Sequence, residues 1–89
     1  MEIRLTRTAS RNLEDIYLYT LREFGAVQAE RYQQRLDEAF RHLALFPQMG
    51  IKSRGRTRRF EVESHLVFYR LEQGALVISR VLHSSQRRR

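Results

Sequence analysis

The sequence predicts an α+β fold of the order β-α-α-β-β-β, in which a helical hairpin packs on a mostly antiparallel sheet. Three observations predict it. The chain opens with a short alternating segment, continues with two amphipathic runs separated by one glycine, and closes with three strand-length segments rich in β-branched and aromatic residues. Its 89 residues, without repeats or a linker, fit one domain spanning 1–89.

The first strand and first helix come from residues 2–25. Ile3 and Leu5 alternate with polar neighbours, as in a half-buried strand, and Thr8 or Ser10 then offers a side-chain oxygen to cap a helix. Gly25 ends this helix, because glycine tolerates the left-handed conformation that turns the chain. Apolar residues at spacings of three and four predict its buried stripe: Leu13, Ile16, Tyr17, Leu21 and Phe24.

A second amphipathic run follows at once and ends at Pro47. Two helices joined by so short a connection must fold back on each other as an antiparallel hairpin. The predicted buried stripe of the second helix is Ala29, Tyr32, Leu36, Phe40 and Leu43.

The sheet is expected from residues 60–62, 66–71 and 76–82, which short turns join into antiparallel hairpins. Their apolar residues fall on both faces: Val67, Tyr69 and Leu71 oppose Leu66 and Phe68, while Val77 and Val81 oppose Leu76, Ile78 and Leu82. One helical hairpin covers one face, so the other is expected to expose apolar and arginine side chains to a partner. The alternative is a sheet that curls over its own side chains.

Positive charge is concentrated in the second half of the chain. Residues 1–50 hold seven Lys/Arg and seven Asp/Glu, whereas residues 51–89 hold ten and three, which accounts for the net charge of +7. This asymmetry indicates a polyanionic or acidic partner, although a solubilising surface is the alternative. The glycine-punctuated loop 50–56 is cationic, and we expect the tail 84–89 to be flexible, with Arg87–Arg89 solvated.

Several classes of protein and site are disfavoured. No apolar run approaches the ~20 residues of a membrane span, and the absence of cysteine agrees with a reducing compartment, so we expect a cytoplasmic protein. The three histidines, His42, His65 and His83, lie far apart in the sequence, which argues against a metal site. Loop 50–55 precedes a strand rather than a helix and so lacks helix-terminal amides for a phosphate. We expect no cofactor.

Candidate catalytic groups are few. His83 follows the last strand close to Arg80, and Glu61 could supply a carboxylate, so the three together could serve phosphodiester cleavage. A lone histidine at a strand end is more often an ordinary surface residue, and no spacing signature supports catalysis. Binding therefore explains the cationic half better than catalysis does.

Four segments together resemble ParE toxins of the RelE/ParE superfamily. They are the first-helix pattern Ala9, Leu13, Ile16 and Tyr19 closing at 24–25, then 43–50, 65–70 and 77–86. The resemblance spans nearly the whole chain. It implies a RelE/ParE-like fold and the toxin of a type II toxin–antitoxin system, which inhibits DNA gyrase and is neutralised by a ParD-like antitoxin, in complexes that can reach higher order.

The same resemblance leaves one enzymatic alternative, a RelE-like ribosome-dependent mRNA endonuclease. Such members use cationic sheet residues and commonly a tyrosine near the C-terminus, whereas this chain has Lys52 as its only lysine and Ser84–Ser85 after His83. A plain nucleic-acid-binding module is a third possibility, so direct nucleic-acid contact stays open.

Two sets of binding residues follow. The predicted target-binding residues are Lys52, Arg54, Arg56, Arg58, Arg59, Arg80 and His83. The predicted antitoxin-binding residues are Leu18, Tyr19, Val27, Phe68 and Tyr69.

Overall fold

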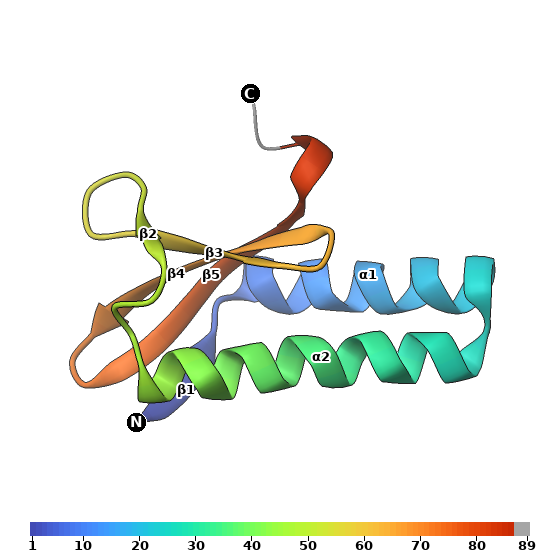
Figure 1. Ribbon diagram of the computed structural model, residues 1–89, viewed down its shortest axis with the longest axis horizontal. Coiled ribbons are helices and arrows are strands. Elements are labelled where there is room, and N and C mark those ends of the chain that lie inside the picture. The colour runs from blue at the N-terminus through green and yellow to red at the C-terminus, as the bar shows by residue number, and fades with distance from the viewer. Residues whose placement is uncertain (87–89) are drawn as a thin grey trace.

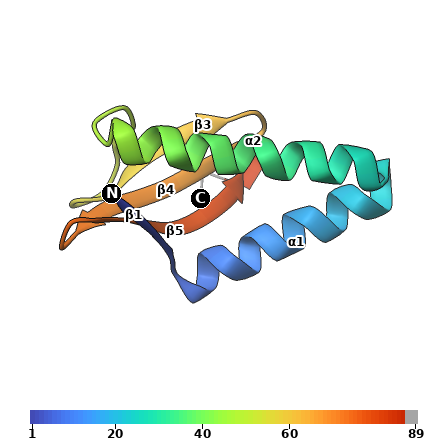
Figure 2. The ribbon, with the colours of Figure 1, turned by 90° about the horizontal axis from the view of Figure 1, so that it is seen from below.

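A computed structural model describes residues 1–86 and has the predicted α+β architecture, with two helices packed on a five-stranded sheet (Figures 1 and 2). The sheet order is β1-β5-β4-β3-β2. The elements are β1 (Glu2–Leu5), α1 (Arg7–Phe24), α2 (Ala26–Leu45), β2 (Ile51–Lys52), β3 (Arg58–Val62), β4 (His65–Glu72), β5 (Ala75–His83) and the 3₁₀ turn η1 (Ser84–Gln86).

Strands β3, β4 and β5 form the expected antiparallel meander. The sequence left the place of the first strand open; β1 lies at one edge, parallel to β5. At the opposite edge, the two-residue strand β2 was not predicted. It pairs antiparallel with β3, with Ile51 opposite Arg59 and Lys52 opposite Arg58. From the sequence, these two residues were expected in a loop. The sheet is therefore mostly antiparallel, as predicted.

The predicted cap of the first helix was wrong. Thr6, not Thr8 or Ser10, caps α1: its Oγ1 accepts from the Ala9 amide at 3.0 Å and donates to the Ser79 carbonyl at 2.9 Å. Thr8 and Ser10 lie inside the helix. Thr6 lies between β1 and α1, so its one hydroxyl can bond to both the first turn of the helix and the sheet.

The predicted stripe of α2 is confirmed: Ala29, Leu36, Phe40 and Leu43 are buried and Tyr32 is half-buried. The stripe of α1 was only partly right. Leu13 is buried, but Leu21 and Phe24 are 37% and 65% exposed. The hairpin extends past the end of the sheet, so its tip has nothing to cover (Figure 1).

A β-bulge changes the faces of β5. Tyr69 pairs with Ile78 but Phe68 pairs with Arg80, so Ser79 is an extra residue in the strand. After the bulge, Val81 points to the same side as Leu76 and Ile78, and all three join the core. The prediction that Val81 opposes Leu76 and Ile78 was therefore wrong, because strict alternation cannot anticipate an inserted residue.

The first three residues of the tail 84–89, which the sequence predicts to be flexible, form the 3₁₀ turn η1. The turn η1 follows β5 directly, and the Ser84 amide donates to the Ser64 carbonyl at 2.8 Å. The tail arginines Arg87–Arg89 lie outside the described residues. Neither helix in the described part of the chain is long and apolar enough to cross a membrane.

Candidate functional site

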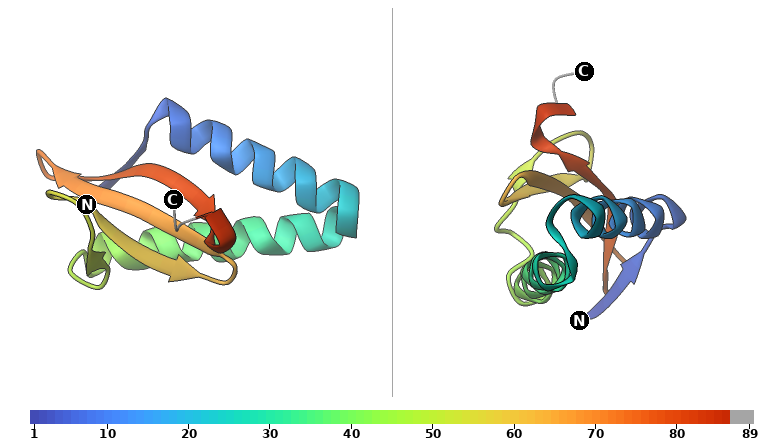
Figure 3. Two further views of the ribbon diagram at one scale, coloured as in Figure 1. Left: turned by 90° about the horizontal axis from the view of Figure 1, so that it is seen from above. Right: turned by 90° about the vertical axis from the view of Figure 1, so that its right-hand side faces the viewer.

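The open face of the sheet carries a row of three side chains, Arg59, Phe68 and Arg80, which we call the arginine row. They lie opposite one another on the adjacent strands β3, β4 and β5, and cross-strand partners project to the same side. Tyr69, next to Phe68, points into the core, so the row points away from it. Seen from above, the strands lie in front of α2, so neither helix covers this face of the sheet (Figure 3).

Phe68 is only 8% exposed although no helix covers it. The Arg80 guanidinium lies 4.7 Å from the centroid of its ring, a cation–π contact in which the arginine shields the ring from water. Leu66, Ala75 and Val77 are also buried. The open face therefore presents arginine over buried apolar side chains, and the predicted exposed mixed patch was wrong in its apolar part.

Charge on this face is unevenly neutralised. Arg70 pairs with Glu72 at 3.0 Å and Arg4 pairs with Glu2 at 3.1 Å. The hydrogen bond from Arg70 lowers the pKa of Glu72, and the nearby charge of Arg56 adds to this effect. Within residues 1–86, neither Arg59 nor Arg80 forms an ion pair. The charges of these two arginines are therefore not neutralised by a carboxylate in the described part of the chain.

The loop between β2 and β3 extends the cationic surface. Lys52, Arg54 and Arg56 are exposed, and backbone bonds from Ser53 to Thr57 and from Thr57 to Arg54 close the loop as a tight turn. Three of the predicted target-binding residues are thus gathered beside the open face.

Arg58 and Tyr69 instead form hydrogen bonds to the connection between α2 and β2, and we call these two residues the loop clamp. Tyr69 Oη donates to the Pro47 carbonyl and accepts from the Gly50 amide, both at 2.8 Å. Arg58 donates to the Gly50 carbonyl at 2.7 Å and to Gln48 Oε1 at 2.7 Å. Arg58 is therefore engaged within the chain, although its partners are uncharged oxygens that leave its positive charge in place, and Tyr69 is 0% exposed. Target binding by Arg58 and antitoxin binding by Tyr69 stay predictions.

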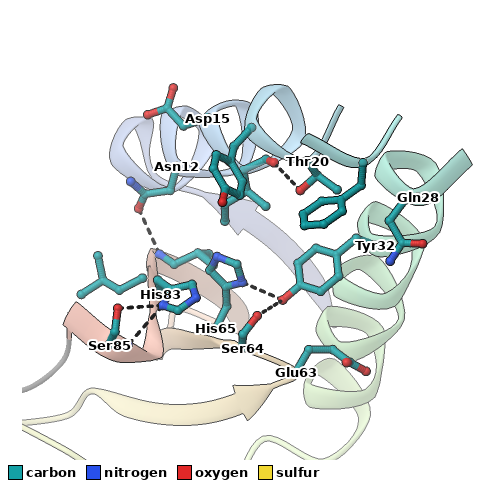
Figure 4. A pocket seen from close by; sticks show the side chains of 15 residues that line it. Asn12, Asp15, Thr20, Gln28, Tyr32, Glu63, Ser64, His65, His83 and Ser85 are labelled. Carbon is teal, nitrogen blue, oxygen red and sulfur yellow. Dashed lines mark hydrogen bonds between the residues drawn. The ribbon is translucent and has the colours of Figure 1, made fainter. Parts of the chain in front are cut away.

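A groove of about 940 Å³ opens on the other side of the molecule, between the helical hairpin and the ends of β4 and β5 (Figure 4). Tyr19 and Phe24 line it with apolar surface, while Asn12, Tyr32 and His65 supply polar groups. We call it the hairpin groove. It offers a partner both apolar contact and hydrogen-bonding groups.

Two histidines meet in the hairpin groove. His65 and His83 lie opposite each other on β4 and β5, with ring centroids 5.2 Å apart. His65 Nδ1 lies 2.6 Å from Tyr32 Oη, and His83 Nδ1 lies 2.9 Å from Ser85 Oγ. Burial, together with the charge of His83, lowers the pKa of His65 from 6.5 to about 4. The two histidines do not form part of a metal site of three ligands, since the described residues hold no group of three potential metal ligands.

The pairing of His65 with His83 was not predicted from the sequence. The two-residue turn at Gln73–Gly74 fixes the register only up to Tyr69 and Ile78. The bulge at Ser79 then shifts the pairing by one residue and aligns His65 with His83. Only knowledge of the bulge would have placed these two residues together.

The candidate catalytic set is not assembled. Glu61 lies opposite Leu66, on the open face with Arg80, whereas His83 lies in the hairpin groove on the helix side. An imidazole and a guanidinium on opposite faces of one sheet cannot act on the same phosphodiester. His83 is for the same reason separated from the other predicted target-binding residues.

The predicted antitoxin-binding residues divide into two groups. Leu18, Tyr19 and Val27 are 49%, 55% and 70% exposed near the tip of the hairpin, which makes an accessible apolar surface. Phe68 lies under Arg80 on the open face instead. The hairpin residues remain candidates for binding, while Phe68 belongs to the arginine row.

The chain is similar to known proteins over almost its full length. A family model described as the ParE toxin of type II toxin–antitoxin system, parDE, matches residues 3–88. Toxin ParE1 of Caulobacter vibrioides is 37% identical, with 97% of this chain and 92% of the relative covered. Toxin ParE1 of Mycobacterium tuberculosis is 34% identical, with 89% and 85% covered.

Two solved structures share the fold. A chromosomal ParDE system from P. aeruginosa matches with a TM-score of 0.82 at 22% identity, covering 93% of this chain and 95% of the other. The toxin–antitoxin complex RelBE2 of Mycobacterium tuberculosis matches with a TM-score of 0.67 at 20% identity, covering 92% and 95%. At these identities the likeness supports the fold alone.

Proposed function

The chain belongs to the ParE toxin family of type II toxin–antitoxin systems, and we propose that it arrests growth by inhibiting DNA gyrase through the open face of its sheet. The observation that carries this proposal is the arginine row beside the cationic loop. Arg59 and Arg80 have no carboxylate partner in the described part of the chain, and Lys52, Arg54 and Arg56 lie next to them. Such a surface favours association with a complex of protein and DNA, whose potential is negative.

A binding mechanism agrees with the separation of His83 from Arg80 and Glu61. The open face holds Glu61 but no imidazole beside the arginines, so it can hold an anionic partner while lacking the acid–base pair that the endonuclease alternative would use. The toxin then acts by occupying its target. Both gyrase and its DNA substrate are cytoplasmic, and we place the toxin there too.

The antitoxin is proposed to bind elsewhere, along the helical hairpin. Leu18, Tyr19 and Val27 give an exposed apolar surface at the hairpin tip, and Tyr19 continues it into the hairpin groove. A ParD-like antitoxin would cover this surface with an apolar segment, and several toxin–antitoxin pairs could assemble through it. Structures described as toxin–antitoxin systems share this fold, which supports such a partner.

A supercoiling assay with purified gyrase and relaxed plasmid tests the target. The toxin should inhibit supercoiling and accumulate cleaved DNA, and Arg59→Ala with Arg80→Ala should raise the half-inhibitory concentration about tenfold or more. Arg22→Ala, on the exposed outer side of α1, is the matched charge control and should behave as the unaltered toxin. Unchanged supercoiling, combined with toxin-dependent breaks in translated mRNA, would support the endonuclease alternative instead.

A further inference from the structure

Several apolar side chains are exposed along the connection where α2 joins β2, far from the hairpin tip. Leu45, Phe46, Met49 and Ile51, within a stretch of seven residues, are 72%, 55%, 47% and 64% exposed. We call these four residues the junction surface. Single exposed apolar residues are ordinary, but four within one short connection indicate contact with another molecule.

The junction surface is held in place by the loop clamp. Tyr69 and Arg58 bind three residues of the connection, Pro47, Gln48 and Gly50. The Met49 amide donates to the Phe46 carbonyl at 3.1 Å, and the Phe46 ring packs against His42 with centroids 5.3 Å apart. A connection fixed by so many bonds presents its apolar side chains preformed, which reduces the entropy lost on binding.

Charge around this surface indicates the chemistry of the partner. Residues 39–60 contain no Asp or Glu. They contain six cations: Arg41, Lys52, Arg54, Arg56, Arg58 and Arg59. An acidic rim around an apolar pocket would complement this pattern.

The same charges argue against two other partners. In a symmetric contact with a second copy, the cations of each loop would face those of the other and repel. Nucleic acid would satisfy the charges and would be able to stack on Phe46, but it would leave the three non-aromatic side chains Leu45, Met49 and Ile51 unused. A protein partner uses both features.

The junction surface is continuous with the arginine row. Ile51 lies opposite Arg59, which lies opposite Phe68, which lies opposite Arg80, so the four residues cross the adjacent strands β2 to β5. It is also remote from the proposed antitoxin surface. Val27 and Leu45 lie near opposite ends of α2, about 27 Å apart at 1.5 Å per residue.

We infer that the junction surface docks the toxin onto an acid-rimmed apolar pocket in the protein part of its target. Under the proposed function, on which this inference rests, that pocket belongs to gyrase. The apolar contacts supply affinity and the cations beside them guide the approach. Target and antitoxin then engage opposite ends of the toxin.

The test uses Phe46→Ser and Ile51→Ser, with Leu71→Ser, another exposed apolar residue, as the matched control. Val27→Ser is the reciprocal variant. All are checked for folding by circular dichroism, for gyrase inhibition, and for binding to co-purified antitoxin. We expect the junction variants to raise the half-inhibitory concentration about tenfold or more while keeping antitoxin affinity. Val27→Ser should weaken antitoxin binding and keep inhibition.

The inference is overturned if the junction variants inhibit gyrase as the unaltered toxin does, or lose antitoxin binding instead. It is also overturned if Ile51→Ser abolishes self-association in sedimentation, or weakens binding to free duplex DNA as much as it weakens inhibition. If the unaltered toxin leaves gyrase unaffected, the proposed function fails separately. The junction variants must then still lose growth arrest while binding antitoxin, and retained growth arrest would refute the docking surface itself.

Discussion

Replacing Tyr69 with phenylalanine removes one oxygen atom from the loop clamp and should destabilise the whole toxin. The hydroxyl donates to the Pro47 carbonyl and accepts from the Gly50 amide, both at 2.8 Å, in a side chain that is 0% exposed. Each bond contributes about 1 kcal/mol, and an unpaired buried donor costs about 1–3 kcal/mol. We therefore expect Tyr69→Phe to lower the free energy of unfolding by about 2–4 kcal/mol.

Urea denaturation followed by circular dichroism measures this loss. In a domain of this size it corresponds to a fall of roughly 10–20 °C in the melting temperature. The matched control is Tyr17→Phe, whose hydroxyl makes a 2.9 Å bond to Glu30 at the surface, where water can replace it. Its effect should stay within about 0.5 kcal/mol. If Tyr69→Phe is no more destabilising than Tyr17→Phe, the buried hydroxyl does not hold the connection and the argument for a preformed junction surface is lost.

Three further predictions concern stability. Gly50→Ala should cost about 2–4 kcal/mol in the same denaturation assay, because a Cβ there would lie 2.4 Å from Tyr69 Oη and 2.8 Å from the Arg59 carbonyl; an unchanged midpoint would contradict this packing. Thr6→Val should cost about 1–2 kcal/mol by removing the α1 cap and the bond to Ser79, and Thr6→Ser should restore most of it; equal effects of the two would show that the hydroxyl is unimportant. His65 has its pKa lowered to about 4, so the unfolded chain binds the proton first as pH falls below 6.5, and stability should decline between these values. The full shift corresponds to at most about 3 kcal/mol, and the partial exposure of His65 reduces this to about 1–2 kcal/mol. His65→Gln should therefore flatten the slope of the unfolding free energy against pH in this window. An unchanged slope would refute the assignment of this pH dependence to His65.

The sequence predicted those parts of the fold that depend on local periodicity. The stripe of α2, the turn at Gly25 and the three-stranded meander all follow from spacings of three, four or two residues. The position of β1 beside β5 could not be predicted, because a four-residue strand carries no information about which edge it joins.

The predictions of site residues were less accurate for a related reason. Lys52, Arg54 and Arg56 were expected in an exposed loop; all three are exposed, with Arg54 and Arg56 in the loop and Lys52 at the end of β2. Arg58 and Tyr69 were not recognised as internal contacts, because each is bonded to backbone atoms of a segment eight to twenty-two residues away. Charge and aromaticity identify candidates for a binding surface, but only tertiary contacts distinguish a residue that is available from one already engaged.

The bulge at Ser79 has a consequence for comparing relatives column by column. Thr6 holds it in place, since its amide donates to the Ile78 carbonyl at 3.0 Å and its hydroxyl donates to the Ser79 carbonyl at 2.9 Å. A relative that lacks this inserted residue would keep Arg80 and His83 on their respective faces, but its numbering would be one shorter from this point. An alignment drawn without a gap at Ser79 would match Arg80 to a helix-facing position and would place a predicted target-binding arginine on the wrong side of the sheet. The roles that an alignment transfers from one member of the family to another therefore depend on where that gap is placed.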